Sequence, residues 1–417
     1  MMPLSMKFCK TSISKIRDWR VNNRARILAI AILLMVLASF MRLNAEFYRL
    51  TLQKGKGAAI DLRFRHKEVQ TWFAGKRVYH RLKKAVYPPA SHAILWPFLG
   101  WTELKEARLL WAATSVVMLG CLSYLLVRES LAETKLEQLF ITLLVLSNYP
   151  VSIAIGNGQF VLHILPALIT GLILVCRREK WSDDLLGAGI FVLALVSPTI
   201  TAPFFWIVLF TPGRVRPAIL VVLGYAAITL FAASFQEGSP ISIIQEWLRI
   251  GEKGAALGSI SGGYSNLHSW LTPFGLREWN RAVSLILLIA LGIWVHRNRR
   301  TDLWVLMGVS AIVARIWTYH RWYDDLLILL PMVSLFRITK LDSSSDKRDS
   351  VVSGILLAAS WVVMLAPARL LVSPSPWNWI TMSSQLAVWT LTLLFLIFHT
   401  RRSRDETTSD EIGMQAA

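Results

Sequence analysis

Apolar runs of about 20 residues recur along the whole chain, and they constrain its fold more than any other feature. Of the 417 residues, 54% are hydrophobic and only 17% are charged, and the mean hydropathy is +0.48. A helix of about 20 apolar residues crosses the ~30 Å hydrocarbon core of a bilayer. Because lipid cannot satisfy free backbone N–H and C=O groups, such spans must be helical. The sequence therefore predicts an all-α polytopic membrane protein.

The runs predict about ten to twelve transmembrane helices within residues 27–399. The N-terminal segment 1–26 is basic and leads into the first run, and no small-residue cleavage site follows, so we interpret this run as an uncleaved span. Prolines interrupt residues 185–211, which form either two crossings or two half-helices that dip into the bilayer. The predicted spans are 27–43, 107–127, 138–155, 159–176, 185–198, 200–211, 217–235, 281–296, 303–319, 325–337, 351–371 and 380–399.

Arginine and lysine gather in the short loops on one predicted side. The positive-inside rule places that side, with segment 1–26, in the cytoplasm. Segments 44–88 and 236–280 are then the major external loops, although 44–88 is itself strongly basic. The polar segment 400–417 is predicted to be a disordered cytoplasmic tail. The basic loops are 177–180, 214–216, 297–300, 337–348 and 401–404.

The net charge of +19 raises the question of nucleic-acid binding, because basic patches attract phosphate polymers. Most of the excess lies at span ends or in segment 44–88, so membrane lipid is the expected partner and nucleic acid is not. The three cysteines, Cys9, Cys121 and Cys176, have no metal-binding spacing. Walker A, dinucleotide-binding and HExxH motifs are absent from the sequence, so ATP hydrolysis, redox chemistry and zinc are not indicated.

Asp61 is one of only three acidic residues in segment 44–88, which carries eleven lysines and arginines. A carboxylate near a bilayer surface can take a proton from a sugar hydroxyl while neighbouring cations hold a phosphate. The alternative is a solvated loop aspartate paired with Arg63 or Arg65. Spacing alone does not separate the two interpretations.

Two further external segments are rich in polar chemistry. Residues 319–325 combine His320, Arg321, three aromatic residues and two carboxylates, a set that suits either a phosphate and sugar site or an interfacial aromatic belt. The Gly- and Ser-rich stretch 261–265, which precedes Asn266, suits either a lid over a site or a plain mobile loop.

A series of short motifs resembles glycosyltransferase family 87, in the expected order and on one predicted face. These membrane enzymes of the GT-C class are similar to polyprenyl-phosphate-mannose-dependent mannosyltransferases. The resemblance extends from about residue 27 to residue 340. The motifs are Asp61-Leu62, Trp72-x-x-Gly75-x-x-x-Tyr79, Tyr87-Pro88-Pro89, Gly158-Gln159, Asn266-x-x-Ser269 and Trp317-x-x-His320.

The resemblance implies a membrane hexosyltransferase that acts on the external face of the cell membrane. Its donor is a polyprenyl-phosphate-sugar and its acceptor is a lipid or glycan. No cofactor is implied, and a single-phosphate leaving group requires no metal in principle. Asp61 is the implied general base, and inversion at the anomeric carbon follows from direct displacement. The implied donor-phosphate residues are His320, Arg321 and Arg63, and the implied substrate-binding residues are Tyr87, Gln159, Asn266, His268 and Trp317.

A transporter or flippase for an anionic lipid or lipid-linked sugar is the alternative function. Such a protein uses the same basic cavity without chemistry. It predicts functional polar groups on both faces and at mid-membrane, whereas the predicted cytoplasmic loops of this chain are short and mostly basic.

Overall fold

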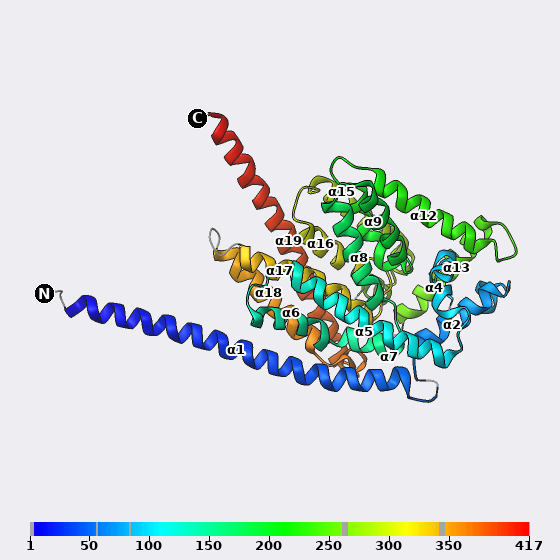
Figure 1. Ribbon diagram of the computed structural model, residues 1–417, viewed down its shortest axis with the longest axis horizontal. Coiled ribbons are helices and arrows are strands. Elements are labelled where there is room, and N and C mark those ends of the chain that lie inside the picture. Colours follow the sequence, from blue (N-terminus) through cyan, green and yellow to red (C-terminus); the bar gives the residue numbers. More distant parts are fainter. Residues whose placement is uncertain (1–3, 56, 83–84, 261–265, 342–346, 417) are drawn as a thin grey trace.

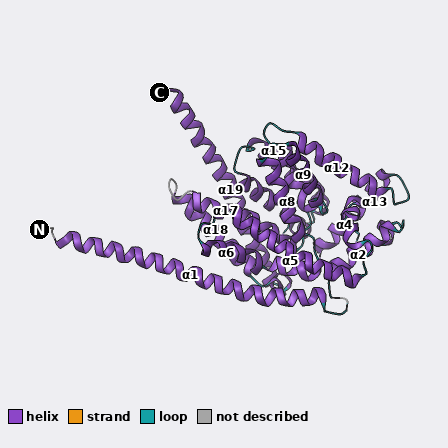
Figure 2. Cartoon of the chain, viewed as in Figure 1, coloured by secondary structure: helices purple, strands orange, loops and turns teal. Residues whose placement is uncertain are grey.

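The computed structural model describes residues 4–55, 57–82, 85–260, 266–341 and 347–416. Figure 2 shows helices and loops, and no strand, throughout these residues. The α-helices are α1 (Leu4–Thr51), α2 (Ile60–Phe73), α3 (Val78–Arg81), α4 (Pro89–Leu99), α5 (Leu104–Glu129), α6 (Lys135–Ser147), α7 (Tyr149–Asn157), α8 (Val161–Arg177), α9 (Trp181–Ala194), α10 (Pro198–Thr201), α11 (Phe205–Leu209), α12 (Arg216–Ala233), α13 (Pro240–Ile260), α14 (Leu267–Leu271), α15 (Asn280–Arg297), α16 (Leu303–Ile316), α17 (Leu329–Leu341), α18 (Lys347–Leu365) and α19 (Trp377–Ala416). The 3₁₀ helices are η1 (Ala202–Phe204), η2 (Thr272–Phe274), η3 (Arg277–Trp279), η4 (Trp322–Ile328) and η5 (Ala368–Val372).

The predicted all-α polytopic architecture is confirmed. Six helices in the described residues are long and apolar enough to cross a membrane, and the pair α6 and α7, bent by 45°, counts as a seventh if it is one span. The other predicted spans correspond to shorter helices that pack among these. The six long spans are Ala29–Thr51, Leu104–Glu129, Arg216–Ala233, Arg277–Arg297, Arg348–Leu365 and Trp377–Arg402.

The helix bundle has two chemically different ends. At one end, α2, α4 and α13 lie together, away from both chain termini (Figure 1). At the other end lie the short basic loops, for example where Arg214 binds Asp184 at 2.9 Å. The helices α8 and α16 run between the two ends, so the residues at opposite termini lie about 25 Å apart in α8 and about 21 Å apart in α16.

Two glycines let α8 and α9 pack closely. A Cβ atom on Gly171 would lie 3.1 Å from the carbonyl oxygen of Gly187, and one on Gly187 would lie 2.9 Å from Val175 Cγ2. Small residues allow such close helix approach in membranes, where packing rather than the hydrophobic effect drives helix association. The pair fixes the axis of α8, whose first residue lies directly beyond Gln159 and Phe160.

Segment 44–88 is largely helical instead of the long loop expected from its polarity. It contains the end of α1, all of α2 and α3, and the turn between them. Leu62, Val69 and Trp72 are fully buried on α2, and their spacing of seven and three residues places them on one helix face. The many charged residues of segment 44–88 lower its mean hydropathy and make this apolar stripe difficult to recognise. The sequence therefore predicts a loop for this segment.

Two other segments are also more regular than the sequence suggested. Segment 236–280 contains α13 and α14, and its Gly- and Ser-rich stretch 261–265 lies outside the described residues. The tail 400–417 was expected to be disordered, but α19 continues through it as far as Ala416. A helix extends more easily than it starts, because each added residue gains a hydrogen bond without a new nucleation cost.

Candidate active site

Asp61 lies in the first turn of α2, at the start of a stripe of charged side chains. Arg65 and Glu68 follow at spacings of four and three residues and so lie on the same helix face. Arg65 and Glu68 are both buried, and Nη1 of Arg65 lies 2.6 Å from the Glu68 carboxylate. The Arg65 guanidinium also lies over the Tyr87 ring, 4.4 Å from its centroid. The buried cation is therefore held by a carboxylate on one side and an aromatic face on the other.

A glycine turn brings Gln159 to Asp61. Gly158 ends α7 with a φ of 70°, a left-handed conformation that glycine adopts without strain. A Cβ atom at this position would lie only 2.5 Å from Cβ of Leu62, the residue after Asp61. Because the glycine leaves this space empty, α2 packs directly on the turn, and Asp61 accepts a hydrogen bond from the Gln159 side chain.

The third contribution comes from the segment around η4. Arg321 and Asp324 both act electrostatically on Asp61, and Tyr323 lies close enough for Asp61, Asp324 and Arg321 to act on its hydroxyl. Three chain segments that are far apart in the sequence thus converge on one carboxylate. The resulting Asp61 cluster consists of Asp61, Arg65, Gln159, Arg321, Tyr323 and Asp324.

The surroundings of Asp61 change its affinity for a proton. Burial raises the pKa of Asp61, while the hydrogen bond from Gln159 and the charges of Arg65 and Arg321 oppose this rise. Burial likewise raises the pKa of Glu68, to about 7, against the opposing charge of Arg65. A carboxylate with a raised pKa is a stronger base than a solvated one once it is ionised, so Asp61 suits proton abstraction.

His320 lies beside the cluster with one ring nitrogen fixed. Its Nδ1 is 3.1 Å from Oδ2 of Asp324, which also accepts a hydrogen bond of 3.1 Å from the backbone N–H of Arg321. The His320 side chain is buried, and within the described residues its Nε2 has no hydrogen-bond partner. An imidazolium in this position has one N–H directed to Asp324 and a second N–H for a ligand.

Asn266, His268 and Trp317 form a supporting layer around the His320 segment. Asn266 caps α14 by accepting a hydrogen bond of 3.0 Å from the Ser269 N–H, and its Nδ2 donates to the carbonyl oxygen of His320 at 3.2 Å. Nε2 of His268 lies 2.9 Å from the Ser284 hydroxyl, which donates to the carbonyl oxygen of Trp317. These contacts hold the backbone that carries His320 and Arg321.

A buried network of an ion pair and hydrogen bonds holds η4 in place through Asp325. Asp325 forms an ion pair with Arg315 of α16 and accepts a hydrogen bond from the Tyr149 hydroxyl of α7. Gln385 of α19 donates to the same hydroxyl at 2.8 Å. Because α7 also ends in the Gly158-Gln159 turn, this network positions two of the three segments that form the Asp61 cluster.

The structure separates Arg63 from the other predicted phosphate-binding residues. Its Nη2 donates to the carbonyl oxygens of Gly55 at 2.7 Å and Ala58 at 3.0 Å, so the guanidinium secures the turn before α2. Arg65 occupies the place expected for a cation beside Asp61. The helical spacing of Asp61, Arg65 and Glu68 was the sequence signal that could have indicated this, but it carries information only once the segment is recognised as a helix.

Comparison with known protein families decides the class of protein. The model of glycosyltransferase family 87 matches residues 85–337, which is more than half of the chain. The chain belongs to glycosyltransferase family 87. Comparisons with curated proteins and with solved structures gave no match.

Membership of glycosyltransferase family 87 makes the protein a membrane glycosyltransferase. The matched range includes Gln159 and the segment around η4, and it begins after Asp61 and Arg63. The resemblance stated from short motifs is thus confirmed at the level of the family. The roles of individual residues rest on the geometry of the Asp61 cluster.

Proposed function

We propose that the protein transfers a hexose, mannose-like, from a polyprenyl-phosphate-sugar to a hydroxyl group of a lipid or glycan acceptor. One observation carries the proposal: a partly buried carboxylate, Asp61, accepts a hydrogen bond from Gln159, and the positive charges of Arg65 and Arg321 act on it. This arrangement supplies a base and nearby positive charge in one site. Both are needed to move a sugar from a phosphate to a hydroxyl group.

In the proposed reaction, Asp61 takes the proton from the acceptor hydroxyl. The acceptor oxygen then attacks the anomeric carbon from the face opposite the phosphate. The bond between that carbon and the phosphate oxygen breaks, and the polyprenyl phosphate leaves with the electron pair. A single displacement of this kind inverts the anomeric configuration. General-base catalysis typically contributes about 10²–10⁴-fold to the rate.

His320 and Arg321 are the proposed contacts of the donor phosphate. Nε2 of His320 is buried and has no hydrogen-bond partner among the described residues, and Arg321 acts on Asp61 from the same segment. Positive groups fixed in advance stabilise the charge that develops on the leaving phosphate. Arg65 is a better third cation than Arg63, because Arg65 acts on Asp61 directly and Arg63 is bonded to the turn before α2.

Tyr87 and Gln159 are the proposed sugar-binding residues. Gln159 has its amide at Asp61, and the Tyr87 ring stacks beneath Arg65 and meets Phe160 edge to face at 5.5 Å between centroids. For Asn266, His268 and Trp317 the contacts favour positioning of the His320 segment over direct binding of substrate. The Tyr323 ring is a further candidate for contact with the sugar.

The Asp61 cluster is proposed to face the exterior of the cell membrane. The basic loops lie at the opposite end of the bundle, and the positive-inside rule places such loops in the cytoplasm. A lipid-linked donor then lies in the membrane with its phosphate at the external surface.

A donor panel with the purified protein in lipid nanodiscs tests this proposal. We expect transfer from a polyprenyl-phosphate-hexose and no transfer from the matching nucleotide-hexose, with the product inverted at the anomeric carbon by NMR. Equal transfer from the nucleotide sugar, or a retained configuration, would contradict the proposal. Movement of the intact lipid-linked sugar between leaflets without transfer would identify a flippase.

A further inference from the structure

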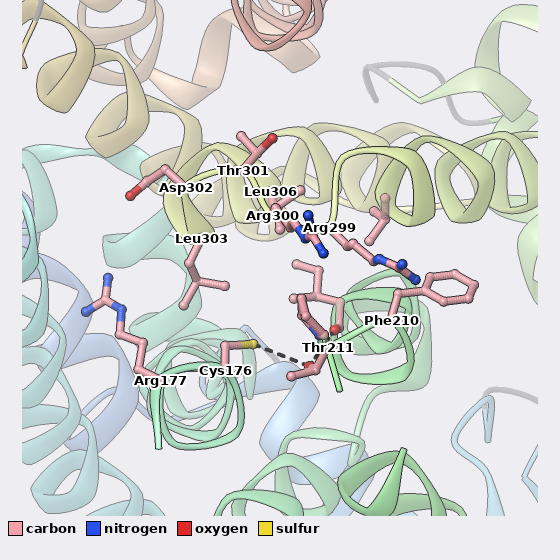
Figure 3. A pocket seen from close by; sticks show the side chains of 13 residues that line it. Cys176, Arg177, Phe210, Thr211, Arg299, Arg300, Thr301, Asp302, Leu303 and Leu306 are labelled. Atoms are coloured by element: carbon pink, nitrogen blue, oxygen red, sulfur yellow. Dashed lines mark hydrogen bonds between the residues drawn. The ribbon is translucent and has the colours of Figure 1, made fainter. Parts of the chain in front are cut away.

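A pocket with a volume of about 340 Å³ lies at the end of the bundle opposite the Asp61 cluster. It is formed where α8 ends, where α11 ends and where α15 is joined to α16, and Figure 3 shows these segments around it. Because α8 starts beside Gln159 and ends at this pocket, the two sites are separated by about the length of that helix, ~25 Å. The pocket is therefore distinct from the proposed active site.

Two arginines supply positive charge to the pocket. Arg299 and Arg300 are exposed residues in its lining, and among the described residues neither has an ion pair or hydrogen bond through its side chain. Figure 3 shows their guanidinium groups on the side of the pocket that faces Thr211 and Phe210. The buried hydroxyl of Thr211 donates to the carbonyl oxygen of Ile207 at 3.0 Å and lies 3.8 Å from Cys176 Sγ, which leaves one lone pair for another donor.

The other charged residues of the lining are already neutralised. Arg177, which Figure 3 shows turned away from Arg299 and Arg300, binds Glu129 at 2.5 Å. Asp302 binds Arg337 at 2.9 Å and caps α16 through the N–H of Trp304. The excess charge of the pocket therefore comes from Arg299 and Arg300, and it attracts an anion with several oxygen atoms.

Apolar residues form much of the remaining wall, and the wall continues onto an exposed apolar surface of α15. Phe210, Leu303 and Leu306 line the pocket. Along α15, Ile286, Ile289 and Ile293 are exposed at spacings of three and four residues and lead toward its edge. Arg299 lies two residues after the candidate span Arg277–Arg297, and a helix of that length that crosses the bilayer would end near the lipid headgroups. A ligand with a phosphate at Arg299 and acyl chains along α15 would contact both the basic side and the apolar wall of the pocket.

We propose that this pocket binds the phosphate headgroup of an anionic phospholipid in the leaflet at this end of the bundle. The predicted orientation makes that leaflet cytoplasmic, where anionic lipids attract basic residues next to a span. The guanidinium groups of Arg299 and Arg300 bind the phosphate oxygens, and the apolar wall holds the start of the acyl chains. This site does not depend on the proposed reaction at Asp61.

The test uses the full chain, delipidated in detergent, and phosphatidylglycerol binding by native mass spectrometry. The variant Arg299→Gln/Arg300→Gln is compared with Arg178→Gln/Arg297→Gln, which removes the same charge from exposed residues at the same end but outside the pocket lining. We expect affinity for phosphatidylglycerol to fall about tenfold or more in the first variant and less than about twofold in the second.

Two further measurements distinguish a lipid headgroup from free inorganic phosphate as the ligand. Zwitterionic phosphatidylcholine is expected to bind the wild type more weakly than phosphatidylglycerol, and inorganic phosphate at millimolar concentration is expected not to displace the lipid. Equal losses in the two variants would show general surface attraction and overturn the proposal. Displacement by inorganic phosphate would overturn the assignment to a lipid. A thermal-melting curve for each variant confirms that the protein remains folded.

Discussion

Gln159, Arg65 and Arg321 each lower the proton affinity of Asp61, so substitution of each residue tests one contribution separately. The hydrogen bond from Gln159 stabilises the ionised carboxylate, and so do the charges of Arg65 and Arg321. Burial acts in the opposite direction and dominates, so the pKa of Asp61 lies above its ordinary value. As the proposed base, Asp61 is active only when it is ionised, which requires a pH above this raised pKa, so we expect transfer to decline as the pH falls through the pKa.

The variant Gln159→Leu is expected to shift this decline to higher pH. Loss of the hydrogen bond removes a contact that lowers the pKa of Asp61, so the pKa rises further and the acidic limb of the kcat/KM profile moves upward. The measurement is kcat/KM between pH 4 and 9, which spans the ordinary carboxyl range and neutrality.

Gln70→Leu is the control for this experiment. Gln70 lies on α2, the helix that carries Asp61, and its amide donates to the carbonyl oxygen of Thr102 at 3.1 Å. The control variant should keep the acidic limb of the wild type. An unchanged limb in Gln159→Leu, or a shift to lower pH, would show that Asp61 is not the group that titrates.

At the residue scale, sequence reasoning identified part of the cluster and missed the rest for a specific reason. Asp61, Gln159 and Arg321 were expected in one site, and the structure brings them together. Arg65 was considered only as a partner in a solvated pair, because segment 44–88 was interpreted as a loop. On a helix, residue i+4 lies beside Asp61 and residue i+2 does not, which distinguishes Arg65 from Arg63.

At the element scale, the contact between α2 and the turn from α7 to α8 determines the site. Leu62 packs against the space left by Gly158, and this packing places the adjacent Asp61 at Gln159. The short motif Gly158-Gln159 thus has a structural meaning for each residue. The glycine permits close approach, and the glutamine supplies the hydrogen bond.

Gly158→Ala is expected to disrupt this contact and reduce transfer strongly. The new Cβ would lie 2.5 Å from Leu62 Cβ, and the backbone φ of 70° is unfavourable for alanine. Together these effects are expected to cost about 1–3 kcal/mol of unfolding free energy. Thermal melting and transfer rate are the two measurements.

Gly189→Ala is the matched control, because a Cβ atom there would meet nothing within 4 Å and the residue lies inside α9. It should be neutral or slightly stabilising, since alanine favours a helix over glycine by up to about 1 kcal/mol. If Gly158→Ala kept the transfer rate of the wild type, α2 would not depend on this turn for its position.

At the scale of the whole molecule, the fold class followed from composition, but the packing did not. Apolar runs predict helices in a membrane irrespective of their neighbours, so the all-α polytopic class was accessible from sequence. The burial of α2 depends on contacts with α4, α5 and α7, which are distant in the sequence. Long-range contacts of this kind leave no local periodicity beyond the stripe of Leu62, Val69 and Trp72.

The two-ended bundle predicts which positions are accessible from each side of the membrane. In a variant without the native cysteines, Gln53→Cys and Leu276→Cys are expected to react with a membrane-impermeant maleimide in intact cells. Lys180→Cys is expected to react only after permeabilisation, because it lies among the basic loops at the opposite end. The opposite labelling pattern would place the Asp61 cluster in the cytoplasm and contradict the proposed orientation.

The role of Asp61 as the base is tested most directly by the transfer rate of Asp61→Asn with saturating polyprenyl-phosphate-hexose and acceptor. Asparagine keeps the size of the side chain and an oxygen that can accept from Gln159, but it cannot take a proton at neutral pH. Asp183→Asn, at the basic end of the bundle, controls for the loss of one carboxylate. We predict a fall of about 10²-fold or more in Asp61→Asn with donor binding retained, and a wild-type rate in Asp183→Asn. A wild-type rate in Asp61→Asn would show that Asp61 is not the base.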